Sequence, residues 1–205
     1  IDKSPLKKER IEGTDLVFLR ELTGGIYFGK KGREDEGNTA YDHCVYSKEE
    51  VRRLAKKGFE MAMSRSKRLC CVDKANVLET SRLWRETVQE MENEYPEVKV
   101  SYEFVDAVAM RLVQWPSEYD VLITENLFGD ILTDEASVIS GSMGLMPSAS
   151  VGSEVSLFEP IHGSFPEGAG KGIANPFGMI RSVAMMLDIR FGLKEESSLI
   201  ESAVE

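Results

Sequence analysis

The chain has 205 residues, 42% of them hydrophobic, which is enough for one large or two small domains with a buried core. Its formal net charge of -10 argues against nucleic acid and anionic membranes as partners, because both repel an acidic surface. No uninterrupted apolar run approaches the ~20 residues that a membrane span requires.

Apolar segments with strand character alternate with helical patterns along the chain, which predicts a layered α/β fold. In chain order, the sequence predicts a strand at 15–20, a helix at 47–66, a strand at 68–73 and a helix at 81–94. A strand at 98–105, a helix at 107–113, a strand at 120–124 and a helix at 127–139 follow. The last predicted elements are a strand at 155–158 and a helix at 176–191.

Four residues mark the ends of these predicted helices. Ser47 begins the sequence S-K-E-E, which is typical of a capping box. Asn126 stands where the helix at 127–139 requires an N-cap. Pro176 is predicted at the first position of the last long helix, and Gly192 ends that helix.

The organisation of the chain changes after residue 140, where glycine and proline interrupt short segments. We therefore predict a boundary near Gly141, with one unit over 1–141 and a second over 142–205. Residues 29–46 are charged, contain glycine and are poor in core residues, so we interpret them as either a mobile loop or an arm. The last residues, 202–205, still read as helical, and we expect the chain to be a piece of a longer polypeptide.

The three cysteines are Cys44, Cys70 and Cys71, and their spacing predicts neither a disulfide framework nor a zinc site. Cys70 and Cys71 are neighbours in an apolar run, which predicts buried thiols. We therefore expect a reducing cytoplasm as the compartment.

Asp130 and Asp134 stand four residues apart, so a helix places both carboxylates on one face. Such a pair repels unless a cation lies between its members, and Mg²⁺ or Mn²⁺ takes oxygen ligands of this kind. The pair follows an apolar strand, and ligands of α/β sheets collect at the carboxyl ends of strands. A solvated acidic face is the competing interpretation, and the spacing alone does not decide between the two.

Polar residues follow two further predicted strands. Asp106 begins a helix, where an aspartate is typically a cap. Lys74 lies beside Asp73 and Asn76, and a lysine in such a place is either solvated surface or a proton-transfer group whose pKa is lowered by burial or by cationic neighbours.

Arg20 and Tyr27 flank the sequence T-G-G, whose glycines permit a tight turn and a close backbone approach. The turn can place a guanidinium, which binds carboxylates in bidentate fashion, and a phenol on one pocket wall. The competing interpretation of Tyr27 is a packed aromatic residue. Residues 159–172 contain small residues after a strand, which suits phosphates, although His162 alone is more often structural and no G-x-G-x-x-G or Walker A pattern is present.

Five ordered blocks resemble the β-decarboxylating dehydrogenase family. They are RELTGGIYFG at 20–29, VDKAN at 72–76, VDA at 105–107, NLFGDILTD at 126–134, and residues 159–176. The resemblance runs from about residue 6 to the end, and the first block resembles the 3-isopropylmalate branch more than isocitrate-type relatives. It implies the two-domain isopropylmalate/isocitrate dehydrogenase-like fold, here with a complete dimerisation domain at 1–141 and part of the NAD-binding domain at 142–205.

The resemblance also implies roles for the metal and substrate residues. Asp130 and Asp134 would bind Mg²⁺ or Mn²⁺ together with the partner subunit's Asp106. Arg20 would pair with a substrate carboxylate, and Asn76 and Asp106 would also lie at the substrate.

The implied catalytic residues are Lys74 and Tyr27. Lys74, reaching in from the partner subunit, would help to remove the proton of the substrate's 2-hydroxyl while hydride passes to the nicotinamide. Tyr27 would take part in proton delivery after decarboxylation.

The resemblance implies that the adenosine half of NAD is bound by the segment at 159–175. The residues concerned are His162, Gly163, Ser164, Glu167 and Asn175. Glu167 stands where NAD-specific relatives usually carry Asp, and its charge would repel a 2′-phosphate, which favours NAD over NADP. Gly168 replaces the bulkier apolar residue expected next.

By the same resemblance, the arm at 29–46 would exchange strands across a homodimer, so that two subunits share each active site. The implied reaction is the NAD-dependent oxidative decarboxylation of 3-isopropylmalate to 4-methyl-2-oxopentanoate in leucine biosynthesis. Sister enzymes acting on malate, tartrate, homoisocitrate or isocitrate stay open as alternatives, because the segment that recognises the substrate side chain is missing. An inert dimerisation and metal-binding fragment, and a non-catalytic Ca²⁺-binding module, are the alternatives from other classes.

Overall fold

The computed structural model describes residues 4–204, which form two compact units. One unit comprises residues 7–136, and the other comprises 137–204 with 4–6. The division lies within α5 (Asn126–Ser140). The roles of 1–141 as a dimerisation domain and of 142–205 as part of a cofactor domain stay predictions. No helix among the described residues is long and apolar enough to cross a membrane.

A four-stranded parallel sheet forms the centre of the larger unit, with strand order β1-β6-β4-β5. Its strands are β1 (Val17–Arg20), β4 (Arg68–Asp73), β5 (Lys99–Phe104) and β6 (Val121–Thr124). All four are predicted from the sequence: β1, β4 and β6 are mainly apolar runs, as parallel strands covered on both faces usually are, and β5 alternates apolar and polar residues.

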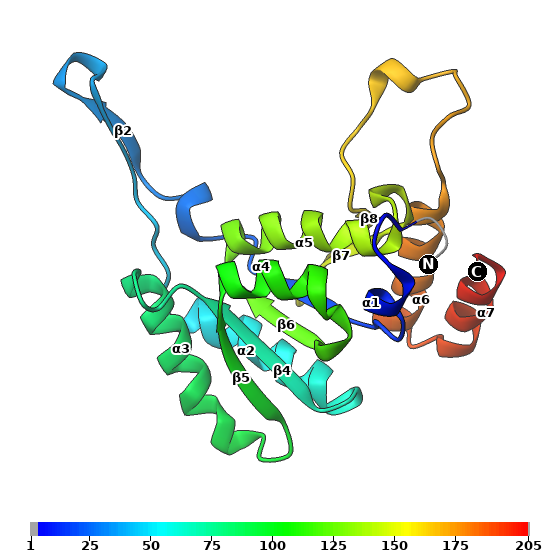
Figure 1. Ribbon diagram of the computed structural model, residues 1–205, viewed down its shortest axis with the longest axis horizontal. Helices are drawn as coiled ribbons and strands as arrows, with labels where there is room; N and C mark the ends of the chain where they lie inside the picture. Colours follow the sequence, from blue (N-terminus) through cyan, green and yellow to red (C-terminus); the bar gives the residue numbers. More distant parts are fainter. Residues whose placement is uncertain (1–3, 205) are drawn as a thin grey trace. The chain divides into compact units, whose positions relative to one another are not determined.

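Helices cover both faces of this sheet (Figure 1). The connections from β1 to β4 through α2 (Lys48–Ser64) and from β4 to β5 through α3 (Glu79–Met91) run in one direction along the sheet. The connection from β5 to β6 through α4 (Val105–Gln114) runs back. Because such crossovers are right-handed, α2 and α3 lie on one face and α4 lies on the other.

The main core lies between the sheet and the α2–α3 layer. Phe59 of α2 and Trp84 of α3 pack there in one buried cluster with Leu69, Cys71 and Ile123 of the sheet. Alternate strand residues point to the opposite face, where α4 packs. Cys70 and Cys71 are both buried free thiols, as predicted.

The start of α2 confirms the predicted capping box. The backbone N–H of Glu50 donates to Ser47 Oγ at 3.3 Å, and the N–H of Ser47 donates to Glu50 Oε2 at 2.7 Å. The predicted cap of α5 is wrong. The helix begins at Asn126 itself, and Glu125 Oε1 accepts the backbone N–H of Phe128 at 2.7 Å. A glutamate side chain therefore caps α5, which leaves the Asn126 side chain available for other partners.

Residues 29–46 contain an antiparallel hairpin of β2 (Lys31–Glu34) and β3 (Thr39–Asp42). Its turn has left-handed backbone angles at Asp35, Glu36 and Gly37. The hairpin projects away from the sheet of its own unit (Figure 1). This segment therefore has regular structure, whereas its exchange across a homodimer stays a prediction.

The smaller unit contains the antiparallel ribbon of β7 (Pro147–Val151) and β8 (Ser156–Pro160), with α6 (Phe177–Phe191) packed on both strands and α7 (Lys194–Val204) packed on α6. Strand β7 is not predicted from the sequence, because proline, serine and alanine form no apolar run. Gly192 ends α6 in the left-handed conformation as predicted, with φ 68°. Pro176 is the N-cap of α6, one position before the predicted one.

The remaining elements are short. They are α1 (Lys8–Ile11) and the 3-10 turns η1 (Gly25–Tyr27), η2 (Asp35–Gly37), η3 (Glu92–Glu94), η4 (Pro116–Glu118), η5 (Met143–Leu145) and η6 (Pro166–Gly168).

Candidate active site

Arg20 lies at the carboxyl end of β1 and turns toward α5. Its neighbour Leu19 packs against the core under α2 and α3, so the alternation of strand side chains directs Arg20 to the opposite face. There, Nη1 of Arg20 lies 2.5 Å from Asp130 Oδ1, and Nε and Nη2 donate to Asn126 Oδ1 at 3.0 and 2.7 Å. A Cβ at Gly129 would lie 2.6 Å from Arg20 Cγ, so only glycine admits the stem of the arginine.

Tyr27 reaches the same carboxylate from the other side of the T-G-G turn. Its hydroxyl donates to Asp130 Oδ2 at 2.8 Å, and its ring centre lies 5.6 Å from the guanidinium carbon of Arg20. The hydrogen bond to Asp130 raises the pKa of Tyr27, so the phenol keeps its proton at neutral pH. Arg20 and Tyr27 therefore converge on one carboxylate, as expected of residues on one pocket wall.

Lys74 and Asp106 form a second cluster at the same edge of the sheet. Lys74 follows β4, Asp106 lies in the first turn of α4 directly after β5, and Lys74 Nζ lies 2.6 Å from Asp106 Oδ1. The hydrogen bond from Lys74 lowers the pKa of Asp106. Asn76 is exposed in the turn that follows Lys74.

The turn that carries Lys74 is fixed by an ion pair to a buried carboxylate. Asp73 is 1% exposed, and its carboxylate accepts hydrogen bonds from Nε and Nη2 of Arg85 at 2.8 and 2.9 Å. Its Oδ1 also accepts the backbone N–H of Ala75 at 2.9 Å, while the N–H of Lys74 donates to Ser81 Oγ at 2.9 Å. The position of Lys74 is therefore set by bonds between the end of β4 and residues of α3 rather than by an isolated loop.

The predicted metal ligands are divided between the two clusters. Asp130 and Asp134 lie on α5, whereas Asp106 is paired with Lys74. Across residues 4–204, no group of three or more His, Cys, Asp or Glu side chains is placed to hold a metal ion. The Asp130 side chain is 46% exposed, and carboxylate oxygens are the ligands that Mg²⁺ and Mn²⁺ prefer. The two α5 carboxylates thus fit one part of an oxygen-ligand site that needs further ligands.

The predicted cofactor residues are exposed and belong to the one loop between β8 and α6. They are His162, Gly163, Ser164, Glu167 and Asn175. His162 Nδ1 lies 2.9 Å from the carbonyl oxygen of Gly163, and Asn175 Oδ1 accepts the backbone N–H of Phe177 at 2.9 Å. The loop extends from its unit (Figure 1), so its imidazole, carboxylate and amide groups are accessible to a ligand.

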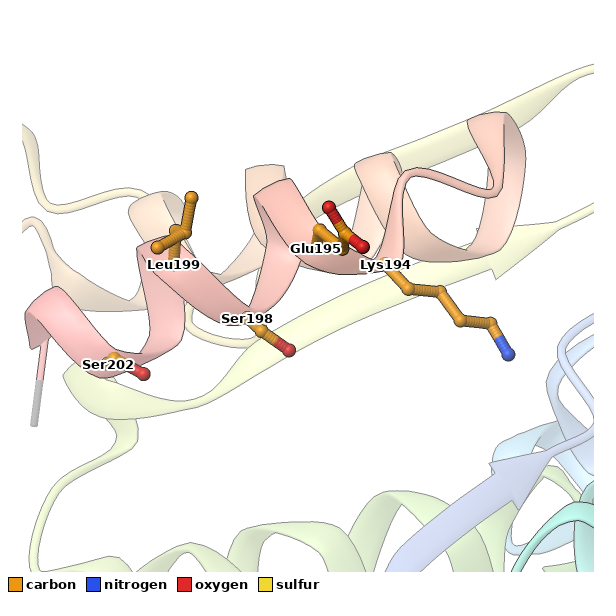
Figure 2. A pocket seen from close by; sticks show the side chains of 5 residues that line it. All are labelled: Lys194, Glu195, Ser198, Leu199 and Ser202. Atoms are coloured by element: carbon orange, nitrogen blue, oxygen red, sulfur yellow. The ribbon is translucent and has the colours of Figure 1, made fainter.

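A separate hollow runs along α7 and carries none of these residues. Figure 2 shows its lining side chains, Lys194, Glu195, Ser198, Leu199 and Ser202, which all come from one helix. A surface that a single helix lines has no second wall to enclose a ligand, so the chemistry of the chain lies elsewhere.

The sequence profile described as isocitrate/isopropylmalate dehydrogenase matches residues 1–205. The chain belongs to this family. It is 55% identical to the 3-isopropylmalate dehydrogenase of Desulfitobacterium hafniense (strain Y51), over 98% of this chain and 57% of that protein. It is also 55% identical to the 3-isopropylmalate dehydrogenase of Bacteroides fragilis (strain YCH46), over 100% of this chain and 57% of that protein. The chain therefore spans less than two thirds of the length of these relatives.

Solved structures of the isocitrate/isopropylmalate dehydrogenase family have the same fold as this chain. A structure of isocitrate dehydrogenase from Methylococcus capsulatus matches with a TM-score of 0.87 and 39% identity, over 94% of this chain and 60% of that one. An apo structure of a β-decarboxylating dehydrogenase from Thermococcus kodakarensis matches with a TM-score of 0.83 and 42% identity, over 94% of this chain and 56% of that one. The predicted fold class is thus confirmed.

Three buried residues of the candidate site in this family member are not predicted from the sequence. Glu21 accepts the backbone N–H groups of Thr23 and Gly24 at 2.9 and 2.7 Å and so holds the T-G-G turn. Tyr46 and Glu125 lie behind Asn126 and are each 6% exposed. The one signal in the sequence is the double glycine. It indicates that another group approaches the backbone of this turn closely, but it does not identify that group as Tyr46.

Proposed function

We propose that this chain is part of a 3-isopropylmalate dehydrogenase, which oxidises and decarboxylates 3-isopropylmalate to 4-methyl-2-oxopentanoate with NAD. The observation that carries the proposal is the convergence of Arg20 and Tyr27 on Asp130, in a chain that is 55% identical to proteins named 3-isopropylmalate dehydrogenase. The sequence R-E-L-T-G-G-I-Y-F-G at 20–29, which resembles the 3-isopropylmalate branch, supports this branch of the family over an isocitrate-specific one.

Arg20 binds a carboxylate of the substrate in this proposal. Its hydrogen bonds to Asn126 and Asp130 leave a further N–H donor on each of the two terminal nitrogens. A guanidinium that is held in place on one side presents these donors in a fixed direction, which suits bidentate binding of a carboxylate.

Asp130 and Asp134 would hold Mg²⁺ or Mn²⁺ with the partner subunit's Asp106. A bound divalent metal supplies Lewis-acid stabilisation of negative charge on the substrate oxygens. The division of the three carboxylates between two clusters of one chain supports a site that two subunits share.

Two side chains move protons in the proposed reaction. Nζ of the partner subunit's Lys74, as the neutral amine, would help to remove the proton of the 2-hydroxyl, and bound NAD would supply the acceptor for the hydride from C2. After CO₂ leaves, the Tyr27 hydroxyl delivers a proton to the carbon that carried the carboxylate. The position of Tyr27 supports this role, because its hydroxyl lies beside Asp130 and the guanidinium of Arg20 on one wall of the candidate site.

The proposed molecule is a homodimer. Met110 and Val113 stand three residues apart on α4 and are 54% and 44% exposed, and Ile131 of α5 is 55% exposed. Exposed large apolar side chains of this kind are typical of a surface that a partner covers. The β2–β3 hairpin adds unpaired strand edges, which are templates for pairing with a second chain.

NAD would bind at the loop between β8 and α6, and the negative charge of Glu167 would favour NAD over NADP. We place the reaction in the cytoplasm, in keeping with the three free cysteines.

The test is NADH formation by the complete polypeptide that contains this chain, with Mn²⁺ and with 3-isopropylmalate, malate, tartrate, homoisocitrate and isocitrate offered side by side. A higher kcat/KM for 3-isopropylmalate, and for NAD over NADP, supports the proposal. A preference for another 2-hydroxy acid keeps the chemistry and refutes the substrate. No turnover of any of them refutes the enzyme.

The 205 residues by themselves have a second candidate function, as an inactive dimerisation and metal-binding fragment. The observation that favours it is the 57% coverage of the relatives. A dimer that binds Mn²⁺ without reducing NAD would support it, and NADH formation by the 205-residue chain would refute it. A non-catalytic Ca²⁺-binding module is tested by the same measurements. It predicts that Lys74→Ala and Tyr27→Phe leave the metal affinity unchanged and that the complete polypeptide has no enzymatic activity.

A further inference from the structure

Asn126 holds the guanidinium of Arg20 on the side away from Asp130. Its Oδ1 accepts N–H groups from both Nε and Nη2, at 3.0 and 2.7 Å, and its Nδ2 donates to the carbonyl oxygen of Gly24 at 3.3 Å. Asn126 is 2% exposed, so these contacts are shielded from water. Such bonds to a charged group are stronger than bonds between neutral groups, and together they fix both the rotation and the tilt of the guanidinium plane.

Tyr46 fixes the backbone of Asn126 in turn. The N–H of Asn126 donates to the Tyr46 hydroxyl oxygen at 3.0 Å, and the hydroxyl donates its proton to Glu125 Oε2 at 3.0 Å. The direction of both bonds is unambiguous, because a backbone N–H can only donate and a carboxylate can only accept. The other oxygen of Glu125 caps α5, so one hydroxyl connects the cap to the first residue of the helix.

The ring of Tyr46 also packs under the turn that carries Tyr27. A Cβ at Gly24 would lie 2.8 Å from Tyr46 Cε1, and a Cβ at Gly25 would lie 2.2 Å from the hydroxyl oxygen. The N–H of Gly25 donates to the carbonyl oxygen of Val45 at 3.1 Å. The place where the arm returns to the body is therefore in direct contact with the turn between Arg20 and Tyr27.

We propose that Asn126 and Tyr46 are positioning residues that hold Arg20 in the orientation in which it binds the substrate carboxylate. Neither residue touches the substrate. Asn126 acts through the guanidinium, and Tyr46 acts through the backbone of Asn126. This inference rests on the proposed role of Arg20, and its geometric part is testable without any turnover.

The geometric test is the exchange rate of the Arg20 Nε proton with water, measured by NMR on the 205-residue chain. The signal is assigned by its loss in Arg20→Lys. We expect slow exchange in the wild type and exchange at least about tenfold faster in Asn126→Ala, because the acceptor of this proton is removed. Asn126→Asp keeps that acceptor and should keep the protection. Tyr46→Phe should raise the rate by a smaller factor, because it loosens Asn126 only indirectly.

The functional test is the KM for the 2-hydroxy acid in the complete polypeptide. We expect Asn126→Ala to raise it about 10- to 100-fold, the range for one or two lost hydrogen bonds to a charged group, and Tyr46→Phe to raise it about three- to tenfold. The KM for NAD should change less than about twofold in both variants.

Tyr119→Phe is the matched control. Tyr119 is 5% exposed, and its hydroxyl also donates to a carboxylate, Glu103 Oε2, at 2.9 Å. It precedes β6, at the edge of the sheet opposite to the candidate site. We expect Tyr119→Phe to lower thermal stability about as much as Tyr46→Phe does, without changing either the exchange of the Arg20 proton or the substrate KM.

Equal exchange rates in the wild type and Asn126→Ala overturn the proposal, whether or not the enzyme turns over. Equal substrate KM values in Tyr46→Phe and Tyr119→Phe overturn the part assigned to Tyr46. Absence of turnover in the wild type refutes the proposed function instead, while the exchange measurement still decides the geometry. If Asn126→Ala does not fold, Tyr46→Phe and Asn126→Asp decide in its place.

Discussion

Lys74 Nζ lies 2.6 Å from Asp106 Oδ1, which joins the carboxyl ends of β4 and β5 by an ion pair. The two side chains are 24% and 67% exposed, and an ion pair that faces solvent adds little to stability. The pair is therefore a better candidate for chemistry than for holding the fold together.

Lys74→Met in the complete polypeptide should lower kcat at least about 100-fold, the usual contribution of a group that transfers a proton, with little change in thermal stability. The pKa of Asp106 should rise toward its ordinary value, because the hydrogen bond that lowers it is lost. Steady-state kinetics and a carboxyl NMR titration measure these effects. Lys67→Met is the control, since Lys67 forms an exposed ion pair with Glu97 directly before β4. Equal activity in the two variants would contradict the role of Lys74.

Gly25→Ala should destabilise the chain more than Gly13→Ala. Both glycines have left-handed backbones, with φ 72° and 74°, so each substitution costs about 1–2 kcal/mol of backbone strain. A Cβ at Gly13 meets no atom within 4 Å, whereas a Cβ at Gly25 meets the Tyr46 hydroxyl oxygen at 2.2 Å. We expect a further loss of about 1–3 kcal/mol at Gly25 from this overlap. Urea unfolding of the 205-residue chain measures the difference, and equal losses would mean that Tyr46 moves aside freely.

Arg85→Gln should lower the free energy of unfolding by about 3 kcal/mol, because it leaves the buried carboxylate of Asp73 without its cation. Arg82→Gln, on the same helix, is the control. Arg82 pairs with the exposed Glu79 and donates to the carbonyl oxygen of Ala75 at 2.9 Å, so its loss should cost about 1 kcal/mol. Chemical denaturation of both variants decides. An equal decrease in the free energy of unfolding in both variants would show that the buried carboxylate of Asp73 does not need Arg85 to be stable.

Asp120 should make stability depend on pH in the acid range. Its burial raises the pKa, but the hydrogen bonds from Ser66 and Arg65 outweigh burial, so the pKa in the folded state is below the ordinary value. The folded state therefore gains stability from this group above about pH 4, the pKa of an unfolded aspartate, and loses it as the pH falls through the lower folded pKa.

Asp120→Asn should cost about 2 kcal/mol at pH 7, and the difference from the wild type should shrink as the pH falls below about 4. Urea unfolding at several pH values measures this difference. Asp15→Asn is the control, because Asp15 pairs with the same Arg65 but its side chain is 81% exposed. A difference between wild type and Asp120→Asn that stays constant with pH would refute the assignment.

The sequence predicts the sheet and the edge of the sheet that carries the chemistry. Strands such as β4 and β6 are apolar runs because both faces are buried, and Arg20, Lys74 and Asp106 lie at or just after the carboxyl ends of strands. Because the strands are parallel, their carboxyl ends lie at one edge. The convergence of Arg20 and Tyr27 on Asp130 follows from that arrangement and from a turn of two glycines.

The buried contacts behind the site are not predictable in the same way. Tyr46 and Asn126 are 80 residues apart in the chain, and Tyr46 ends a segment that is mostly exposed and poor in core residues. The N-cap of α5 is assigned wrongly for a related reason. Asn is the favoured cap by propensity, but Glu125 takes that place because the Tyr46 hydroxyl supplies a donor to its buried carboxylate.

The ring of Tyr46 fills the space that a side chain at position 24 or 25 would need. Changes at these three positions should therefore not be independent in evolution. A side chain at 24 or 25 becomes tolerable only after the ring at 46 has become smaller, and a smaller residue at 46 leaves a hole that further changes must fill. Each single step should lower the stability of the fold before a second one restores it. Homologous sequences should therefore change at these positions in linked sets or not at all, and a chimaera that takes the turn from one relative and the arm from another should fold poorly when the two come from different sets.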